Sequence, residues 1–176
     1  SGLASVIIPM AKAFGIRVIT TVRTQEFAER IGHLKADRVV VTSKEDIAAV
    51  LKEEMENGHA VDVAIDCLGG EGMGECLRYL RHGARWIMIA ALAGTKTEID
   101  LKNIYVRNVR IIGSTLRSRT PKVKAEILAG IVRDVLDQAD DSCRSSHRTG
   151  GRCPPYPLRR EKRGEGCIDG DLSFVA

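Results

Sequence analysis

A chain of 176 residues, of which 44% are hydrophobic, is long enough for one well-packed domain and too short for two full-sized ones. A formal charge of +4 is too small to indicate nucleic acid as a partner, and no apolar run approaches the roughly 20 residues that cross a bilayer. We therefore expect a cytoplasmic protein with neither a nucleic-acid nor a membrane partner. The five cysteines are odd in number and irregularly spaced, so they do not indicate a disulfide framework.

Residues 1 to 138 alternate apolar, β-branched runs with amphipathic stretches, which predicts strands and helices in turn. A helix over 6–14 ends at Gly15, and further helices are predicted over 25–34, 46–56, 74–80 and 122–136. Strands are predicted over 16–21, 38–41, 61–66, 85–90 and 109–114. This alternation predicts a doubly wound, Rossmann-like parallel sheet of the α/β class, because right-handed crossovers place helices on both faces. The strand expected before the first helix is absent, so we expect a sheet that is incomplete at the N-terminus.

Small residues recur where the predicted strands end, and ligands of such sheets bind at this edge. Glycines lie in 67–70, in 91–94 and in the half-present turn Ser1-Gly2-Leu3-Ala4 before the first helix. Glycine lets a flat ligand approach the backbone, although any single glycine is equally well explained as a turn residue. Asp66 ends one strand beside this edge, where hydrogen bonding to the following loop is favoured over contact with a cofactor.

The end of the second expected strand bears on the choice of cofactor. NAD sites usually carry an acid there, whereas NADP sites recruit a cation. The segment Thr21–Thr24 has no acid, and Arg23 can hold a 2′-phosphate through two hydrogen bonds. The alternative is a solvated surface arginine. We therefore predict NADPH, with NADH open as the alternative.

Several stretches are similar to the medium-chain dehydrogenase/reductase superfamily, and most similar to its zinc-free NADPH:quinone oxidoreductase branch. The resemblance covers about residues 1 to 138 and is most specific in Gly-Ser-Thr-Leu-Arg-Ser-Arg; the stretches are 11–20, 36–37, 61–70 and 113–119. It implies hydride transfer from NADPH to a quinone or enone, with no metal, because the cofactor carries the chemistry. The family's barrel-like catalytic domain is absent from the sequence, so we expect this chain alone to be a weakly stable, inactive fragment whose catalytic residues are unassigned.

The resemblance also implies roles for individual residues. Gly2 and Leu3 are expected at the pyrophosphate, and Thr24 matches the family serine at the 2′-phosphate. The nicotinamide end is expected along Ala91, Leu92, Ser114, Thr115 and Leu116. The segment 109–115 matches the edge strand through which these enzymes dimerise. Phe27 and Thr42 stand where the family has a lysine and a tyrosine near this phosphate.

Residues 139–176 lose all periodicity and gain Cys, Pro, Arg and Ser, which predicts an irregular, disordered tail. We hypothesise a reading-frame shift near 137–140, which translation of the neighbouring frame tests. A zinc module is the alternative, but its ligands lack the usual close pairs; they would be Cys143, His147, Cys153 and Cys167.

Two other functions stay open. One is a non-catalytic module that holds an adenine nucleotide, and the other is part of a related enoyl-thioester reductase. S-adenosylmethionine-dependent transferases are less favoured, because they usually place an acid where Thr21–Thr24 has none.

Overall fold

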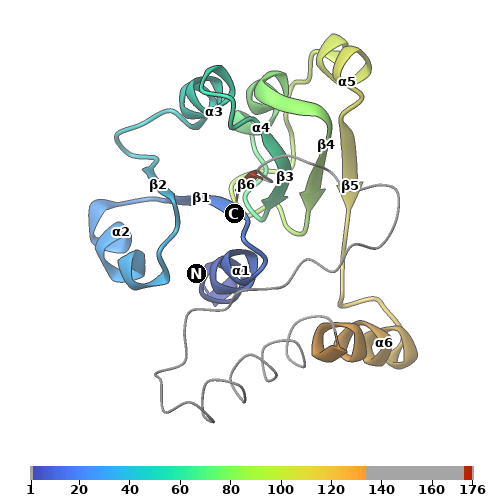
Figure 1. Ribbon diagram of the computed structural model, residues 1–176. Coiled ribbons are helices and arrows are strands. Elements are labelled where there is room, and N and C mark those ends of the chain that lie inside the picture. Colours follow the sequence, from blue (N-terminus) through green and yellow to red (C-terminus); the bar gives the residue numbers. More distant parts are fainter. Residues whose placement is uncertain (1, 134–172, 176) are drawn as a thin grey trace. The chain divides into compact units, whose positions relative to one another are not determined.

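The computed structural model describes residues 2–133 and 173–175 (Figure 1). The chain divides into two units, the first comprising Ser1–Lys12, Ile16–Ser114 and Gly170–Ala176, and the second Ala13–Gly15 and Thr115–Asp169. The first unit contains every strand, and the second contains one helix, α6 (Pro121–Ile131), among the described residues. Thr120 begins α6, since its Oγ1 accepts a hydrogen bond from Val123 N at 3.4 Å.

All pairings in the sheet are parallel, in the order β2-β1-β6-β3-β4-β5. The strands are β1 (Arg17–Val22), β2 (Arg38–Val41), β3 (Val61–Asp66), β4 (Leu80–Met88), β5 (Arg110–Gly113) and β6 (Ser173–Val175). The predicted doubly wound α/β fold is confirmed. β4 begins earlier than predicted because Leu80 is fully buried beside Val61, and Gly83, with φ +79°, lies where the register between β3 and β4 shifts.

The helices of the first unit are α1 (Gly2–Ala13), α2 (Gln25–Ile31), α3 (Ile47–Glu56), α4 (Gly72–Cys76) and α5 (Leu101–Arg107), α1 reaching one residue into the second unit. The pattern did not predict α5. Asp100 begins this helix by accepting a hydrogen bond from Lys102 N at 2.9 Å, and Asn108 ends it in the left-handed conformation at φ 52°.

Two apolar clusters lie on opposite faces of the sheet. Val18 belongs to the cluster under α1, together with Ile7, Ile8 and Ala11. The next residue, Ile19, belongs to the larger cluster formed with α3, α4 and β4, because successive side chains of a strand point to opposite faces. The central strands are therefore apolar on both sides, as parallel sheets require. Figure 1 shows α1 apart from α3 and α4.

The prediction for the C-terminal tail lies outside the described residues over 139–172. The alternative zinc ligands and the proposed frame shift fall in the same part of the chain. Ser173–Val175 differs from the prediction of an irregular tail, since it forms β6 between β1 and β3.

The amino ends of β1 and β2 are tied down by ion pairs. The carboxylate of Glu54, a residue only 3% exposed, lies 2.9 Å from Arg17 Nη2 and 3.3 Å from Arg38 Nη1. Arg38 Nη2 also lies 2.9 Å from the exposed carboxylate of Glu53. Removing the buried charge would leave two arginines without their shared partner.

Beside this network, Asp37 connects α1 to β1. Burial by itself would raise the pKa of Asp37, but the hydrogen bonds from Lys12 Nζ and Val18 N and the charges of Lys12 and Arg17 outweigh it and lower that pKa. The lowered pKa means that Asp37 stabilises the fold above the ordinary carboxyl pKa, and that this contribution is lost as the pH falls through its folded value.

Glu54→Gln is expected to lower the free energy of unfolding by about 2 kcal/mol, because charge-assisted hydrogen bonds to a buried carboxylate are lost. Glu53→Gln is the matched control and should change stability far less, because Glu53 is exposed. Urea denaturation of both variants measures the difference, and equal stabilities would show that burial of the Glu54 carboxylate contributes nothing.

A second prediction concerns two glycines of α4. A Cβ on Gly74 would overlap the carbonyl oxygen of Glu98, whereas a Cβ on Gly72 would meet open space. Gly74→Ala should therefore cost about 1–3 kcal/mol of stability through overpacking. Gly72→Ala should leave stability unchanged or raise it by up to about 1 kcal/mol, because alanine is the better helix former. Thermal unfolding compares the pair, and two equally stable variants would contradict the close packing of residue 98 on α4.

Candidate functional site

A groove of about 510 Å³ lies where β3 and β4 end. Its walls are the loops that follow these two strands, and the lining residues are Gly69, Gly70, Glu71, Gly72, Ala93, Gly94, Thr95 and Lys96. This is the sheet edge at which ligands of doubly wound folds bind. The sequence identified both loops by their glycines but did not single out Thr95 or Lys96.

Backbone hydrogen bonds join the two loops. Gly70 N donates to Gly94 O at 3.0 Å, Leu92 N to Cys67 O at 3.1 Å, and Ala93 N to Leu68 O at 2.8 Å. Gly69 has φ +60°, and a Cβ there would lie 2.7 Å from Gly94 O. Glycine is therefore required at position 69 both by conformation and by space.

The carboxylate of Asp66, the last residue of β3, holds the loop that follows this strand. Its Oδ1 accepts hydrogen bonds from Leu68 N at 2.7 Å and Gly69 N at 3.0 Å, and its Oδ2 accepts one from Trp86 Nε1 at 3.1 Å. These bonds use both carboxylate oxygens within the fold. These contacts support the role expected from the sequence, which is hydrogen bonding to the loop after β3.

The N-terminus of α1 points toward the same sheet edge. Ile16 N bonds to Ala11 O at 3.0 Å and β1 follows at once, so α1 ends where β1 begins. A helix of 12 residues is about 18 Å long, close to the length of a six-residue strand, which brings Gly2 level with the carboxyl ends of the strands. Gly2 and Leu3 lie in the first turn of α1 and not in a loop before it, and Leu3 packs against the cluster under α1. The backbone N–H groups of this first turn have no partner within the helix, as at every helix N-terminus.

Arg23 and Thr24 lie together after β1. Arg23 is exposed, and it has no ion pair with any residue in 2–133. Thr24 begins α2 without a hydrogen bond from its side chain to the helix. The structure adds Lys44, which follows β2 and donates a hydrogen bond from Nζ to Gln25 Oε1 at 3.1 Å. Lys44 was missed, although its position three residues after a predicted strand was a usable signal.

The two residues that depart from the family pattern lie in the same region. Phe27 is 44% exposed and has the guanidinium carbon of Arg30 at 5.4 Å from its ring centre. Thr42 Oγ1 donates to Val22 O at 3.2 Å, which ties the end of β2 to the end of β1. Neither side chain supplies a cation.

The residues expected at the nicotinamide end fall into two groups. Ala91 and Leu92 lie in the loop after β4, with Leu92 79% exposed, and Ser114 N bonds to Met88 O at 2.8 Å. Thr115 and Leu116 belong to the second unit, and their role stays a prediction.

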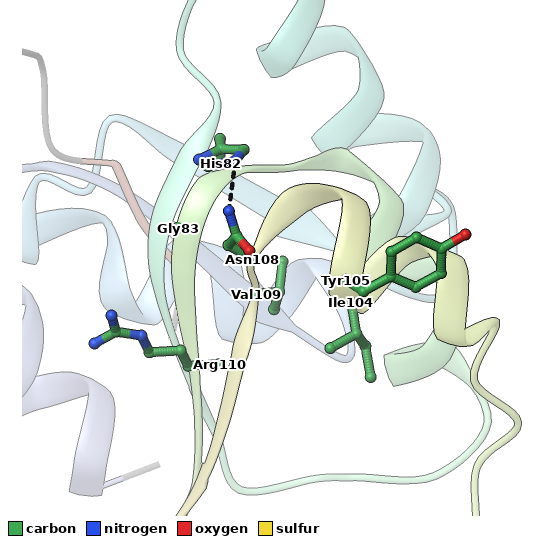
Figure 2. Close-up of a pocket in the computed structure, with 7 residues that line it drawn as sticks. All are labelled: His82, Gly83, Ile104, Tyr105, Asn108, Val109 and Arg110. Carbon is green, nitrogen blue, oxygen red and sulfur yellow. Dashed lines mark hydrogen bonds between the residues drawn. The ribbon is translucent and has the colours of Figure 1, made fainter.

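A second hollow, of about 530 Å³, lies at the amino ends of β4 and β5 (Figure 2). His82 and Asn108 point toward one another across it, with 2.9 Å between Nε2 and Nδ2. It contains none of the expected cofactor residues and lies at the edge opposite the strands' carboxyl ends. We therefore do not place the cofactor there.

Cys76 of α4 is a buried, free cysteine. Burial raises the pKa of Cys76 to about 12, so its thiol is protonated at neutral pH and the side chain is a buried part of the core. Among the described residues, no three His, Cys, Asp or Glu side chains are grouped as metal ligands. The same residues contain no helix long and apolar enough to cross a membrane.

Comparisons with known proteins agree with this geometry. The model of the family described as zinc-binding dehydrogenase matches residues 2–131. The chain is 24% identical over 144 residues to the mitochondrial enoyl-[acyl-carrier-protein] reductase of Xenopus tropicalis, covering 78% of this chain and 41% of that protein.

Two solved structures share the fold. A putative NADPH:quinone reductase from Mesorhizobium loti has a TM-score of 0.65 at 25% identity, covering 76% of this chain and 39% of that one. YhdH from E. coli K-12, solved with bound NADPH, has a TM-score of 0.60 at 18% identity, covering 76% and 40%.

The chain spans less than half the length of each of these three relatives. The match to the family model covers most of the chain, and the parallel sheet with its glycine-lined carboxyl edge agrees with it. The chain therefore belongs to the zinc-binding dehydrogenase family, within the medium-chain dehydrogenase/reductase superfamily.

Proposed function

We propose that this chain is the NADPH-binding portion of an oxidoreductase that reduces a quinone or enone. The observation that carries the proposal is the groove at the carboxyl ends of β3 and β4, with Arg23 and Lys44 after the neighbouring strands β1 and β2. Relatives described as an NADPH:quinone reductase and as a protein with bound NADPH support this reading. The chain by itself is proposed to bind cofactor without catalysing reduction.

The two cations are the proposed 2′-phosphate site. Arg23 and Lys44 come from the ends of adjacent strands, and Thr24 lies beside Arg23 with a hydroxyl that does not cap α2. A phosphate dianion takes hydrogen bonds and charge from such groups more strongly than a neutral hydroxyl does. Lys44 would thus supply a positive charge near the 2′-phosphate, in place of the family lysine at whose position this chain has Phe27.

The remaining groove residues would hold the rest of the cofactor. The backbone of Gly2 and Leu3 would face the pyrophosphate, where the free N–H groups of α1 favour an anion. Ala91, Leu92 and Ser114 would border the nicotinamide. NADPH, when bound, supplies the hydride, and the exposed Leu92 side chain would shield the ring from water.

An enoyl thioester is the second acceptor class. It is favoured by the similarity to the mitochondrial enoyl-[acyl-carrier-protein] reductase. An oxidoreductase that contains this chain as its cofactor-binding portion would be assayed with a quinone and with an enoyl thioester. The rate of NADPH oxidation would separate the two acceptor classes, because only the preferred acceptor gives rapid oxidation.

The cofactor proposal is tested by titrating the 176-residue chain with NADPH and NADH, following nicotinamide fluorescence. Arg23→Ala and Lys44→Ala should each weaken NADPH binding about tenfold, because each removes a charge-assisted contact, and should leave NADH binding nearly unchanged.

Lys52→Ala is the control, since Lys52 lies on α3 with its side chain 55% exposed and pairs only loosely with Glu56. A folded chain that binds neither cofactor would refute the proposed function. Equal losses of NADPH and NADH affinity would refute the 2′-phosphate site alone.

We also propose that β5 joins two copies of the chain into a homodimer. β5 is the last strand of the sheet, and Ile111 and Ile112 are 38% and 39% exposed. Tyr105 and Val106 of the preceding helix are also exposed. An apolar edge strand whose outer side pairs with no described strand favours pairing with a second copy about a two-fold axis.

Ile112→Lys should convert the dimer into a monomer, because it places a charge on the apolar edge. Val6→Lys is the control, since Val6 is an exposed apolar residue of α1 away from β5. Sedimentation velocity at several concentrations measures the change. A wild-type chain that is monomeric at every concentration would contradict the dimer.

A further inference from the structure

An exposed aromatic ring lies within one helical turn of the proposed 2′-phosphate site. Phe27 is 44% exposed and comes three residues after Thr24, the residue that begins α2. A residue that begins a helix and the third residue of that helix are within reach of one another, as in the capping box. The ring of Phe27 therefore lies close to Thr24 and to its neighbour Arg23.

Arg30 limits the orientations of this ring. The guanidinium carbon of Arg30 lies 5.4 Å from the centre of the Phe27 ring, and residues three apart in a helix are surface neighbours. A cation over the face of an aromatic ring is attracted to it. Among the described residues, no second ring or cation lies over Phe27. The exposed ring thus has one face turned to Arg30 and the opposite face available to a ligand.

Phe27 differs in position from the other aromatic side chains that the structure describes. Trp86 is buried within β4. Phe14, Tyr79 and Tyr105 precede β1, β4 and β5, and so lie toward the amino edge of the sheet. Phe27 follows β1 and lies toward the carboxyl edge, where the cofactor is proposed to bind. Of these described rings, Phe27 is therefore the one on which a base bound at that edge can stack.

The chemistry of NADPH brings its adenine near this ring. The 2′-phosphate is attached to the same ribose that carries adenine, so a site that holds the phosphate also fixes the base within a few ångströms. Arg23 and Lys44 are the proposed ligands of that phosphate, and Lys44 Nζ is 3.1 Å from Oε1 of Gln25, in the first turn of α2. Bases stack on aromatic side chains through their π faces, whatever phosphates they carry.

We propose that the Phe27 ring, oriented by Arg30, stacks on the adenine of the bound cofactor. This contact rests on the proposed function and adds a determinant that NADPH, NADH and simple adenine nucleotides such as AMP share. Phe27 thus sets the affinity for adenine nucleotides as a class, whereas Arg23 and Lys44 set the preference for a 2′-phosphate. The ring stands where the family has a lysine, so this contact is particular to this chain.

The test compares Phe27→Leu and Phe27→Ala with the unsubstituted 176-residue chain. Leucine keeps an apolar side chain and removes the π face, so it separates stacking from simple apolar contact. Phe14→Leu is the matched control, because Phe14 is 43% exposed and precedes β1. Nicotinamide fluorescence follows the binding of NADH and NADPH, proton NMR follows the binding of AMP, and thermal unfolding shows that each variant is folded.

Phe27→Leu and Phe27→Ala should each weaken the binding of AMP, NADH and NADPH about tenfold, because one base–ring stack is lost. The ratio of NADPH to NADH affinity should stay unchanged, since both cofactors carry the same base. The base protons of AMP should shift upfield on binding to the unsubstituted chain, because they lie over an aromatic ring, and this shift should be lost with Phe27→Leu. Phe14→Leu should change none of these quantities.

A Phe27→Leu chain that binds AMP and NADH as tightly as the unsubstituted chain would overturn the stacking contact. A loss confined to NADPH would also overturn it, because the ring would then act at the phosphate. NADPH binding that is weakened by Arg23→Ala but not by Phe27→Leu would refute stacking and leave the proposed function standing. AMP binding through Phe27, with neither dinucleotide bound more tightly than AMP, would refute the proposed function and support the adenine contact. A folded chain that binds none of the three ligands would overturn both.

Discussion

The parallel alignment of the strands is the constraint on which the rest of the molecule depends. It brings the carboxyl ends of β1, β2, β3 and β4 to one edge, together with the first turn of α1. It also requires apolar residues on both faces of the central strands, which Val18 and Ile19 supply to opposite clusters. The groove and the core are therefore two consequences of one arrangement.

The same alignment separates the charges of the sheet. At the amino edge, Glu54, Glu53 and Asp37 pair with Arg17, Arg38 and Lys12, so these charges are neutralised locally. At the carboxyl edge, Arg23 and Lys44 have no ion pair within the described part of the chain. An anionic ligand is attracted to the edge whose cations remain uncompensated, since paired charges contribute little field at a distance. The ion pairs neutralise the charges of the amino edge, so an anionic ligand is expected to bind at the carboxyl edge.

The periodicity of the sequence was enough to predict strands β1 to β5 and the fold class, because buried parallel strands are continuous apolar runs. It did not predict α5, which depends on Asp100 and Asn108 at its ends more than on a long apolar stripe. It could not predict β6, since three residues have no period and their placement depends on a gap formed by distant strands. Among the site residues, Arg23 and Thr24 were predicted from their place after a strand. Lys44 follows β2 in the same way and was missed, because its nearness to the end of β1 depends on the pairing of these two strands.

The groove depends on backbone more than on side chains. Gly69 and Gly94 approach so closely that a Cβ at position 69 would meet a carbonyl oxygen, and Asp66 holds the loop through backbone N–H groups. The shape of this groove therefore depends on the glycine at position 69 and on the Asp66 carboxylate more than on the other side chains of the two loops.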